Sequence, residues 1–443
     1  MNSSSSEEST NFASLPPELQ IEIFQLAQPK FRPLHKLPFE VILSHVSSFW
    51  RNFALTTPLL WRRIDIYSLR SLERVSQYLQ RSGTQMTLDI YIDLYKADYF
   101  ISQRKMAMSV DLIANAMLPH IHRARTLFIF ACLEDTVTML LSYFISSSAP
   151  NLKSLRAFGR LCSTTALRAP GMKVFNGGLP RLTSLETGLP NYLPSLALQN
   201  LTTLYLHTFT DSLDLSYRSF VAMITAPPCL SHLSLQGSMN FAADWPSLSN
   251  WPDFVMNSLK CLRFQGGGMF ALTILLLMFA PNLESLWLDL INNFGQLFDA
   301  MQVSQPARFP ALKYLTIPTY DHNNFSKVFP TITHLHLPAN FFRDDRLVEL
   351  LLGQWRHLHT LVVSMIWEPE SSRFHGALRH FLPYRRNAGY PIRKLLVDDH
   401  LFRALKKEKP DISGEVDIEL LTLESYREPW WIISMDYFEQ NDM

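Results

Sequence analysis

The sequence has few cysteines and little excess charge, and both shortages narrow the classes of protein that it can encode. Its 443 residues include four cysteines, and no two of them form a CxxC pair. Scattered single cysteines are typical of free thiols in a reducing compartment, so we expect a cytoplasmic or nuclear protein. The net charge at pH 7 is +1. Nucleic-acid-binding domains usually carry a clear basic excess, so we expect no nucleic-acid partner.

Long apolar runs are also missing. The longest, "MFALTILLLMFA" over residues 269–280, ends at Pro281. It is shorter than the roughly 20 residues that a membrane-spanning helix needs, so we interpret it as a buried helix and expect no membrane association. The N-terminal "MNSSSSEEST" has serines and acids where a signal peptide has basic and apolar residues. Residues 1–11 are therefore predicted to be a disordered tail.

Signatures of catalysis and of metal binding are weak. The motifs GxSxG, HExxH and GxxxxGK[ST] do not occur, and they are the patterns that place a nucleophile, a zinc ion or a phosphate. His334 and His336 lie two residues apart, and Cys229 with His232 forms a CxxH. Neither pair has further ligands at a recognised spacing. We therefore predict no metal, no cofactor and no catalytic residue.

One glycine pattern resembles a nucleotide-binding loop. In "QGGGMFA", the residues Gly266, Gly268 and Ala271 fit GxGxxG/A, after the predicted strand "LKCLRFQ" and before an apolar helix. Glu284 follows at about the distance expected of an acid that binds a ribose. The same glycines also suit any turn from a strand to a helix. A nucleotide-binding enzyme built around Gly266–Gly268 therefore remains a remote alternative.

Apolar residues at helical spacing predict a small helical domain over residues 12–66. Its first helix begins in "LPPELQIEIFQLA", where proline suits the first turn and Leu19, Ile23 and Leu26 share one face. A connector interrupted by prolines follows. A second helix is predicted over residues 39–54, and a short turn is expected to begin at "TTPLLW", where a threonine can cap it.

The two blocks "LPPELQIEIFQLA" and "LSHVSSFWRNFALTTPLLWRRI" together resemble the F-box, in the form found in fungal, basidiomycete-like F-box proteins. They agree with that family in order and spacing, with one departure at Ser47, where the family often has cysteine. The resemblance implies that the domain binds the adaptor subunit of SCF-type cullin–RING ubiquitin ligases. The residues implied to contact the adaptor are Leu15, Pro16, Leu19, Ile23, Phe24, Leu43, Val46, Trp50 and Arg51.

The rest of the chain repeats the pattern LxxLxL. Clear copies begin at Leu201, Leu230, Leu259, Leu283, Leu312, Ile332 and Leu358, and weaker ones at Ala124, Leu152, Leu182 and Ile392. A period of about 20–29 residues with this pattern is the signature of leucine-rich repeats, each with one strand and one helix or turn. The copies are irregular and mostly lack the usual asparagine. They resemble the degenerate leucine-rich repeats that follow F-boxes in fungal proteins.

These patterns predict an α/β fold, a small helical F-box followed by an irregular leucine-rich-repeat solenoid or horseshoe. The expected order is a tail over residues 1–11, the F-box over 12–66, a linker or N-terminal cap over 67–120, repeats over 121–400 and a C-terminal cap or tail over 401–443. The tandem Trp430 and Trp431 are expected to cap the last repeat, because exposed tryptophans are costly.

Residues between the leucines of each copy are expected to point away from the core. Many of them are aromatic or arginine, the types that anchor protein interfaces. The predicted substrate-binding surface comprises Arg156, Tyr205, His207, His232, Arg263, Trp287, Asp289, Tyr314, His334 and His336, and Phe128 and Phe158 fall at equivalent positions.

The sequence thus predicts a non-catalytic substrate-recognition subunit of an SCF-type ubiquitin ligase. Its F-box would bind the adaptor and, through it, a cullin–RING scaffold, and its repeats would bind an unknown protein substrate. A leucine-rich-repeat interaction protein that works outside any ubiquitin ligase is the alternative, with the helical domain as a cap of the repeats or a vestige.

Overall fold

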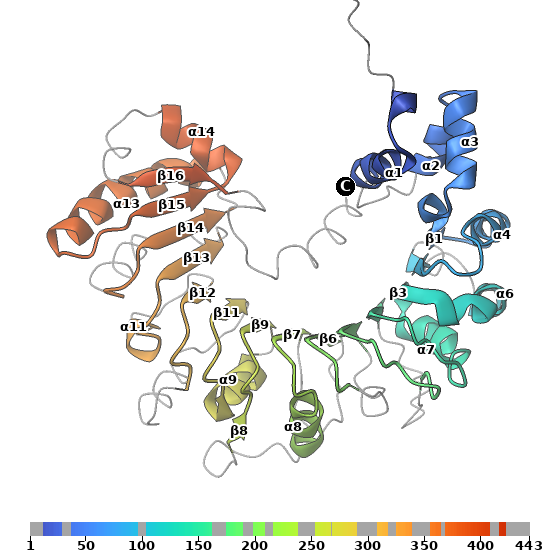
Figure 1. Cartoon of the computed structure of the whole chain (residues 1–443). Helices are drawn as coiled ribbons and strands as arrows, with labels where there is room; N and C mark the ends of the chain where they lie inside the picture. The colour runs from blue at the N-terminus through green and yellow to red at the C-terminus, as the bar shows by residue number, and fades with distance from the viewer. Residues whose placement is uncertain are drawn as a thin grey trace, which may run out of the picture. The chain divides into compact units, whose positions relative to one another are not determined.

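The chain forms two compact units of mixed α/β structure, drawn in Figure 1 from a computed structural model. The units are Met1–Leu182 with Ser195–Ala197, and Thr183–Pro194 with Leu198–Met443. The predicted α/β class is confirmed, and the boundary between the units falls within the series of repeats. The structure describes residues 12–28, 37–95, 103–161, 174–188, 198–208, 216–237, 253–266, 268–289, 308–317, 325–338, 355–364, 368–407 and 416–421. The predicted tail over residues 1–11 and the pair Trp430–Trp431 lie outside these ranges.

Short helices form the N-terminal part of the first unit. They are η1 (Phe12–Ser14), α1 (Pro17–Ala27), α2 (Phe39–Ser44), α3 (Ser48–Thr56) and η2 (Pro58–Trp61). The single helix predicted over residues 39–54 is wrong, because the chain forms two helices there. The side chain of Ser47 accepts a hydrogen bond from the Trp50 backbone N–H at 3.2 Å and so caps the start of α3, as serine often does.

An aromatic cluster holds these helices together. The Phe24 ring of α1 is 3% exposed and lies 4.9 Å from Trp50 and 5.2 Å from Phe53. Phe12 stacks on Trp50 at 5.0 Å and lies 5.2 Å from Phe24. Ring pairs at these separations add to the stability that burial alone provides. The two sequence blocks that resemble the F-box therefore pack against each other and share one small core.

The same helices pack on α4 (Ser71–Arg81). Trp61 is 1% exposed, and its indole N–H donates to the Ala54 carbonyl at 2.6 Å. The ring of Tyr78 meets Trp61 edge-on at 5.0 Å, and the Arg81 guanidinium lies 4.3 Å from the Trp61 ring. The helical domain is thus packed against the element that follows it.

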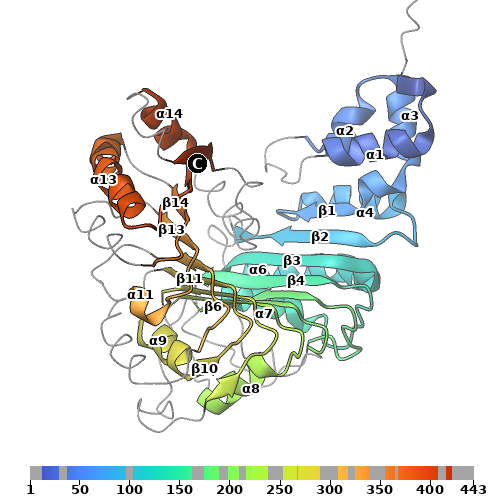
Figure 2. The same cartoon turned by 60° about the vertical axis from the view of Figure 1, so that its left-hand side comes forward.

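In the described part of the first unit, four parallel strands follow in the order β1-β2-β3-β4 (Figure 2). They are β1 (Arg63–Ile66), β2 (Leu88–Asp93), β3 (Ala124–Leu133) and β4 (Ser154–Leu161). Between them lie α6 (Gln103–Met117), η3 (Leu118–Arg123) and α7 (Glu134–Ser142). β2 and α6 lie within the segment expected to be a linker or N-terminal cap over residues 67–120.

In the described part of the second unit, ten parallel strands follow one another in chain order, whereas β8 (Phe254–Val255) and β10 (Met278–Phe279) pair with each other. The strands are β5 (Ser184–Thr187), β6 (Thr203–Thr208), β7 (His232–Gly237), β9 (Cys261–Gln265), β11 (Ser285–Asp289), β12 (Tyr314–Thr316), β13 (His334–Pro338), β14 (Thr360–Ser364), β15 (Lys394–Val397) and β16 (Asp417–Leu420). Each LxxLxL copy contains residues of a strand, from β3 for the first copy to β15 for the last.

Helices accompany only some of these strands within the described ranges. They are α8 (Tyr217–Thr225), α9 (Gly268–Leu277), α11 (Phe325–Val328), α13 (Glu368–Asn387) and α14 (Asp399–Lys407). The apolar run "MFALTILLLMFA" forms most of α9 and then enters the short strand β10 (Met278–Phe279), which pairs with β8 (Phe254–Val255). Across the described helices, none combines the length and the hydropathy that a membrane crossing requires.

A ladder of leucines runs through the second unit. Leu204, Leu233, Leu262, Leu286 and Leu315 occupy matched register positions on successive strands, and each is 0% exposed. One such leucine cannot be buried by its own repeat, so each strand depends on its neighbours for burial. This ladder is the core to which the repeated sequence pattern contributes.

Recurring turns precede the strands and replace the missing asparagines. The first leucine of many copies donates its N–H to the carbonyl three residues earlier, as in Leu283 to Ala280 at 3.2 Å and Leu152 to Ala149 at 3.1 Å. Side chains bridge neighbouring turns, because Asn282 donates to the Asn257 carbonyl at 2.8 Å. The polar groups of the turns are thus paired, as buried backbone requires.

Candidate functional site

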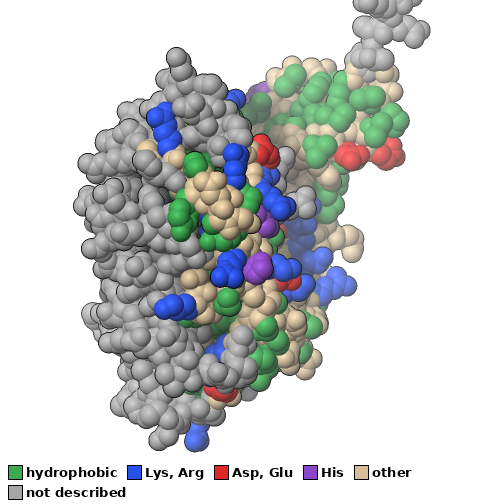
Figure 3. Space-filling model, turned by 90° about the vertical axis from the view of Figure 1, so that its left-hand side faces the viewer, with side chains coloured by type: hydrophobic (Ala, Val, Ile, Leu, Met, Phe, Trp, Pro, Cys, Tyr) green, Lys and Arg blue, Asp and Glu red, His purple; other side chains and the backbone are tan. Residues whose placement is uncertain are grey.

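Exposed apolar side chains gather on the N-terminal helices, at the upper right of Figure 3. On α1, Leu19 is 46% and Ile23 41% exposed, and on the later helices Val46 is 60% exposed. Contiguous apolar patches on a protein surface commonly mark sites where a partner binds. We call this set the apolar surface; its members are Leu19, Ile23, Leu26, Ile42, Val46, Phe49 and Leu55.

The residues implied to contact an adaptor fall into two groups. Leu19, Ile23 and Val46 belong to the apolar surface, Pro16 and Arg51 are exposed, and Leu15 and Trp50 are partly buried. Phe24 and Leu43 are each 3% exposed, so we correct their assignment: they pack the helices together.

The adaptor contacts predicted from the sequence omit four members of the apolar surface, Leu26, Ile42, Phe49 and Leu55. Ile42 and Phe49 fall within the single helix that the sequence predicts over residues 39–54, and Leu55 falls just beyond it. The break between α2 and α3 at Ser47 changes which side chains share a face. A serine cap is the signal that could have revealed this break. Arg51 also spans it, because its Nε donates to the Ser44 carbonyl at 3.0 Å.

The second candidate surface is the face of the sheet between the leucines of the second unit. Tyr205, Arg263 and Trp287 lie there at equivalent register positions, and they are 3%, 6% and 6% exposed. The Arg263 guanidinium lies 4.3 Å from the Trp287 ring. His207 and His336 are each no more than 2% exposed. The prediction that these five side chains are open to a partner is therefore corrected, because they pack against neighbouring strands.

Two buried histidines on this face serve as polar links between strands. His207 Nε2 lies 2.8 Å from Glu186 Oε1. His336 Nε2 lies 2.9 Å from the Ser364 hydroxyl, and its Nδ1 lies 3.4 Å from that of Thr316. Burial lowers the pKa of His336 to about 3. This imidazole is therefore neutral near pH 7.

Other predicted residues are less covered. His232, Tyr314 and His334 of the second unit and Arg156 of the first are partly buried, and Arg156 lies 5.2 Å from the Phe128 ring. Phe128 and Phe158 are buried, and Asp289 is the last residue of β11. Within each unit, the register of the parallel strands therefore places the predicted residues on neighbouring strands of the sheet. Only some of these residues are partly exposed.

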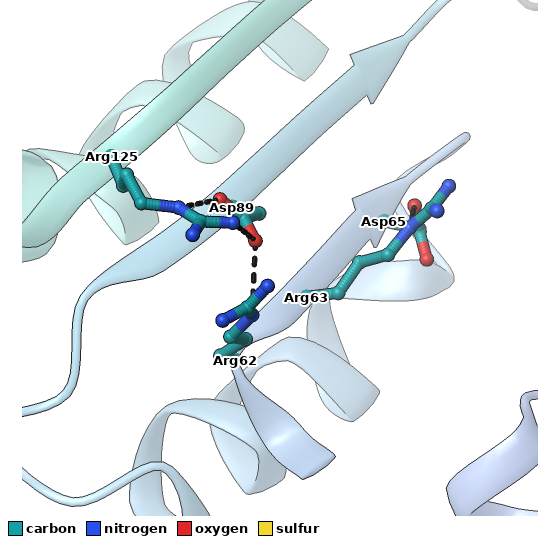
Figure 4. Close-up of polar contacts among 5 residues, drawn as sticks. All are labelled: Arg62, Arg63, Asp65, Asp89 and Arg125. Atoms are coloured by element: carbon teal, nitrogen blue, oxygen red, sulfur yellow. Dashed lines mark hydrogen bonds and ion pairs between the residues drawn. The ribbon is translucent and has the colours of Figure 1, made fainter. Parts of the chain in front are cut away.

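Charged side chains in the first unit link three adjacent strands (Figure 4). Asp89 of β2 accepts two hydrogen bonds from Arg125, at 2.9 and 2.7 Å, and lies 3.1 Å from Arg62. On β1, Arg63 pairs with Asp65 at 3.0 Å. The hydrogen bond to Asp89 is the leading cause that raises the pKa of Arg125. These paired charges have the character of structural links between strands.

The glycine motif has a structural explanation. Gly266 follows β9 with φ +83°, and a Cβ built there would lie 3.2 Å from the carbonyl oxygen of Gly237. A left-handed conformation and a close backbone neighbour both favour glycine. Gly266 is therefore required by the packing of two adjacent turns, whether or not a nucleotide binds.

Metal-binding groups are not apparent in the described ranges. There, no three or more His, Cys, Asp or Glu side chains come together so that they could hold a metal ion. Cys132 and Cys261 are buried and Cys229 is exposed, while Cys162 lies outside the described residues. No protein-family model matches the chain, and a search of the curated proteins finds no similar sequence. The apolar surface and the face of the sheet are therefore the candidate binding sites of this chain.

Proposed function

We propose that this chain is the substrate-recognition subunit of an SCF-type cullin–RING ubiquitin ligase. The observation that carries the proposal is the apolar surface, which lies on a domain whose sequence resembles the F-box. Leu19, Ile23 and Val46 are three of its members and were implied by that resemblance. Burying apolar area contributes about 25 cal/mol per Å². A partner that covers these side chains would therefore gain substantial binding energy.

The repeats would form an irregular leucine-rich-repeat solenoid that holds a protein substrate. The series of parallel strands and the leucine ladder support this reading, since stacked repeats bury each other's apolar faces. No residue of this chain would perform chemistry. Ubiquitin transfer would be accelerated because the bound substrate is held near a ubiquitin-loaded enzyme on the same scaffold, which raises its effective concentration.

Copurification from the native host tests the proposal. The full-length chain should bring down an adaptor and a cullin, identified by mass spectrometry. The double variant Ile23→Asp with Val46→Asp should lose both, because a carboxylate in an apolar interface is costly. A matched control is Met108→Asp with Leu112→Asp on α6, whose side chains are 59% and 51% exposed. The control should keep both partners.

These point variants are preferable to deleting residues 1–66. The deletion would remove Glu40 and Trp61, which are buried against α4. Loss of binding could then reflect a damaged first unit. A full-length chain that brings down no adaptor and no cullin would contradict the proposal directly.

The alternative is a repeat-type interaction protein that works outside any ubiquitin ligase. The contacts of Glu40 and Trp61 with Tyr78 favour it, because they are those expected of a helical cap on the first repeat. Such a chain would elute from a sizing column at the same volume with and without purified adaptor. A shift of the wild-type chain, absent in the Ile23→Asp, Val46→Asp variant, would exclude this alternative.

A further inference from the structure

Basic and histidine side chains mark the N-terminal ends of adjacent strands in the second unit. Lys313 immediately precedes β12, His334 begins β13, His359 immediately precedes β14, and Arg393 immediately precedes β15. Adjacent strands of a sheet lie about 4.8 Å apart. Four consecutive strands therefore present a cation or an imidazole at the same edge, and Figure 3 shows Lys, Arg and His side chains near one another on the face that it draws.

We call this set the basic edge; its members are Lys260, Lys313, His334, His359, Arg393 and Lys394. Lys260, Lys313 and Arg393 are exposed, and the other members are partly buried. Within the part of the chain that the structure describes, Lys313 and Arg393 have no ion-pair partner, whereas Lys394 pairs with Glu419 at 2.7 Å. Unpaired cations at one edge leave a positive surface that an anion can neutralise.

Acidic side chains at this edge are few. Glu284 precedes β11, which lies between β9 and β12 in the sheet. Asp417 begins β16, which pairs with β15. No acid immediately precedes or begins β12, β13, β14 or β15. The positive charge is therefore concentrated on these four strands.

The pKa values of His334 and His359 also reflect the positive charge of the basic edge. The His334 ring lies 4.3 Å from Tyr314 and 5.0 Å from His359. Burial, the largest cause, and the positive charges of His359, Lys394 and Lys313 together lower the pKa of His334 to about 4. Burial and then Arg393 lower the pKa of His359. Nearby cations oppose protonation of these rings, so an anion bound there would favour it.

Two buried donors lie on β11, beside the basic edge. Among the residues that the structure describes, the Ser285 hydroxyl and the Trp287 indole N–H have no hydrogen-bond partner, although these residues are only 4% and 6% exposed. The indole N–H can only donate. Buried polar groups without a partner are uncommon, and an acceptor oxygen supplied by a ligand would satisfy them. This observation independently favours a ligand that is rich in acceptors.

We propose that the basic edge binds an acidic segment of a protein, with its carboxylate or phosphate groups placed along β12–β15. This inference rests on the proposed function for the role of that protein as substrate, and it adds the chemical class of the segment that is recognised. Complementary charge speeds association and selects partners, and exposed contacts of this kind weaken as salt is added.

Fluorescence anisotropy on the full-length chain tests the inference. The probe is a short labelled peptide of alternating glutamate and serine, and its counterpart has glutamine in place of glutamate. Lys313→Glu with Arg393→Glu should weaken binding of the glutamate peptide about tenfold or more. The matched control is Arg218→Glu with Lys327→Glu, which reverses two exposed charges on α8 and α11. The control should bind almost as the wild type does.

The outcomes separate the possible ligands. A phosphoserine version that binds more tightly identifies phosphate as the preferred group, and equal binding identifies carboxylate; both support the inference. Equal binding of the glutamine peptide, or equal losses in the two double variants, would overturn it. A single-stranded oligonucleotide that binds more tightly than every peptide would reassign the edge to nucleic acid and overturn it as well.

The two proposals fail separately. Lys313→Glu with Arg393→Glu should still copurify the adaptor, and Ile23→Asp with Val46→Asp should still bind the glutamate peptide. If adaptor copurification fails but the glutamate peptide binds the basic edge, the ligase proposal is wrong and the edge is a binding site of a different kind of protein. If the peptide fails to bind while the adaptor copurifies, only the inference about the acidic segment is wrong.

Discussion

The Tyr78 hydroxyl of α4 donates a hydrogen bond to Glu40 Oε1 of α2 across 2.6 Å, and both residues are buried. A contact between residues 38 positions apart fixes how the N-terminal helices sit on the first strand–helix pair of their unit. It also places a carboxylate where water does not reach, since Glu40 is 0% exposed. Hydrogen bonds to charged acceptors are among the stronger ones.

Tyr78→Phe should therefore destabilise the first unit. The change removes one hydrogen bond from a buried carboxylate, which costs about 1–3 kcal/mol of unfolding free energy. Urea unfolding followed by tryptophan fluorescence measures the difference. Glu40→Gln is the matched control, because its amide oxygen can still accept from Tyr78, and its loss should be smaller. A Tyr78→Phe protein as stable as the wild type would contradict the expected role of this bond.

Trp50 and Val46 should respond differently to substitution. Trp50 contacts Phe12 and Phe24 at 5.0 and 4.9 Å, so Trp50→Ala leaves a cavity and should cost about 2–4 kcal/mol. Val46 is 60% exposed, so Val46→Asp should change stability by less than about 0.5 kcal/mol. Thermal unfolding of both variants, with adaptor binding measured in parallel, separates folding from recognition. Equal stability losses in the two variants would contradict the assignment of Val46 to the surface.

The parallel strands were the part of the fold most accessible from sequence. The leucines of one strand are buried by the strands on either side of it, so each strand of the series needs leucines at the same positions. The LxxLxL pattern therefore predicts a strand wherever it occurs. The position of Leu262 shows this dependence, since it lies in register with Leu233 and Leu286 and is fully buried. The helices were less predictable, because between strands the chain can bury apolar residues in several conformations. "MFALTILLLMFA" accordingly changes from helix to strand at Met278.

The candidate surfaces were harder to predict than the strands. Alternation places Arg263, Trp287 and His336 on one face of the sheet, but it does not say whether that face is covered. Exposure depends on contacts made by residues distant in sequence, and a period-two pattern carries no information about these. The basic edge was missed for a related reason. Its residues precede or begin five different strands, and only the register of parallel strands brings Lys313, His359 and Arg393 to the same edge.

The buried imidazole of His336 should make stability depend on pH. Its folded-state pKa, about 3, lies below the ordinary value of 6.5, so the unfolded chain takes up a proton that the folded chain does not. The stability that the neutral His336 imidazole contributes to the folded chain is present above about pH 6.5, and it is lost as pH falls toward 3. For a group this deeply buried, the loss amounts to about 2–3 kcal/mol between pH 7.5 and pH 4.5.

His336→Gln isolates this effect from the titration of other groups. Glutamine does not titrate and can still hydrogen-bond to Ser364 or Thr316. The stability of the His336→Gln variant should therefore fall less than that of the wild type between pH 7.5 and pH 4.5. Urea unfolding at several pH values gives the two slopes. Identical slopes for the wild type and His336→Gln would show that this histidine does not contribute to the pH dependence.

Gly266 should tolerate substitution poorly for reasons of backbone geometry. Alanine there must adopt φ +83° and approach the Gly237 carbonyl oxygen to 3.2 Å, which costs about 1–3 kcal/mol. Gly376 lies within α13, and a Cβ there meets nothing within 4 Å. Gly376→Ala should therefore be neutral or stabilise by about 0.5–1 kcal/mol. Thermal unfolding measures both variants.

The same pair of variants tests the remaining enzyme alternative. If the glycines cradle a nucleotide, calorimetry of the wild-type chain should detect binding of a nicotinamide or adenine nucleotide, and Gly266→Ala should abolish it while Gly376→Ala leaves it intact. If Gly266 serves only the packing of adjacent turns, the wild type shows no heat of binding, and Gly266→Ala lowers stability alone. We expect the second result, because the close approach of Gly237 already accounts for glycine at this position.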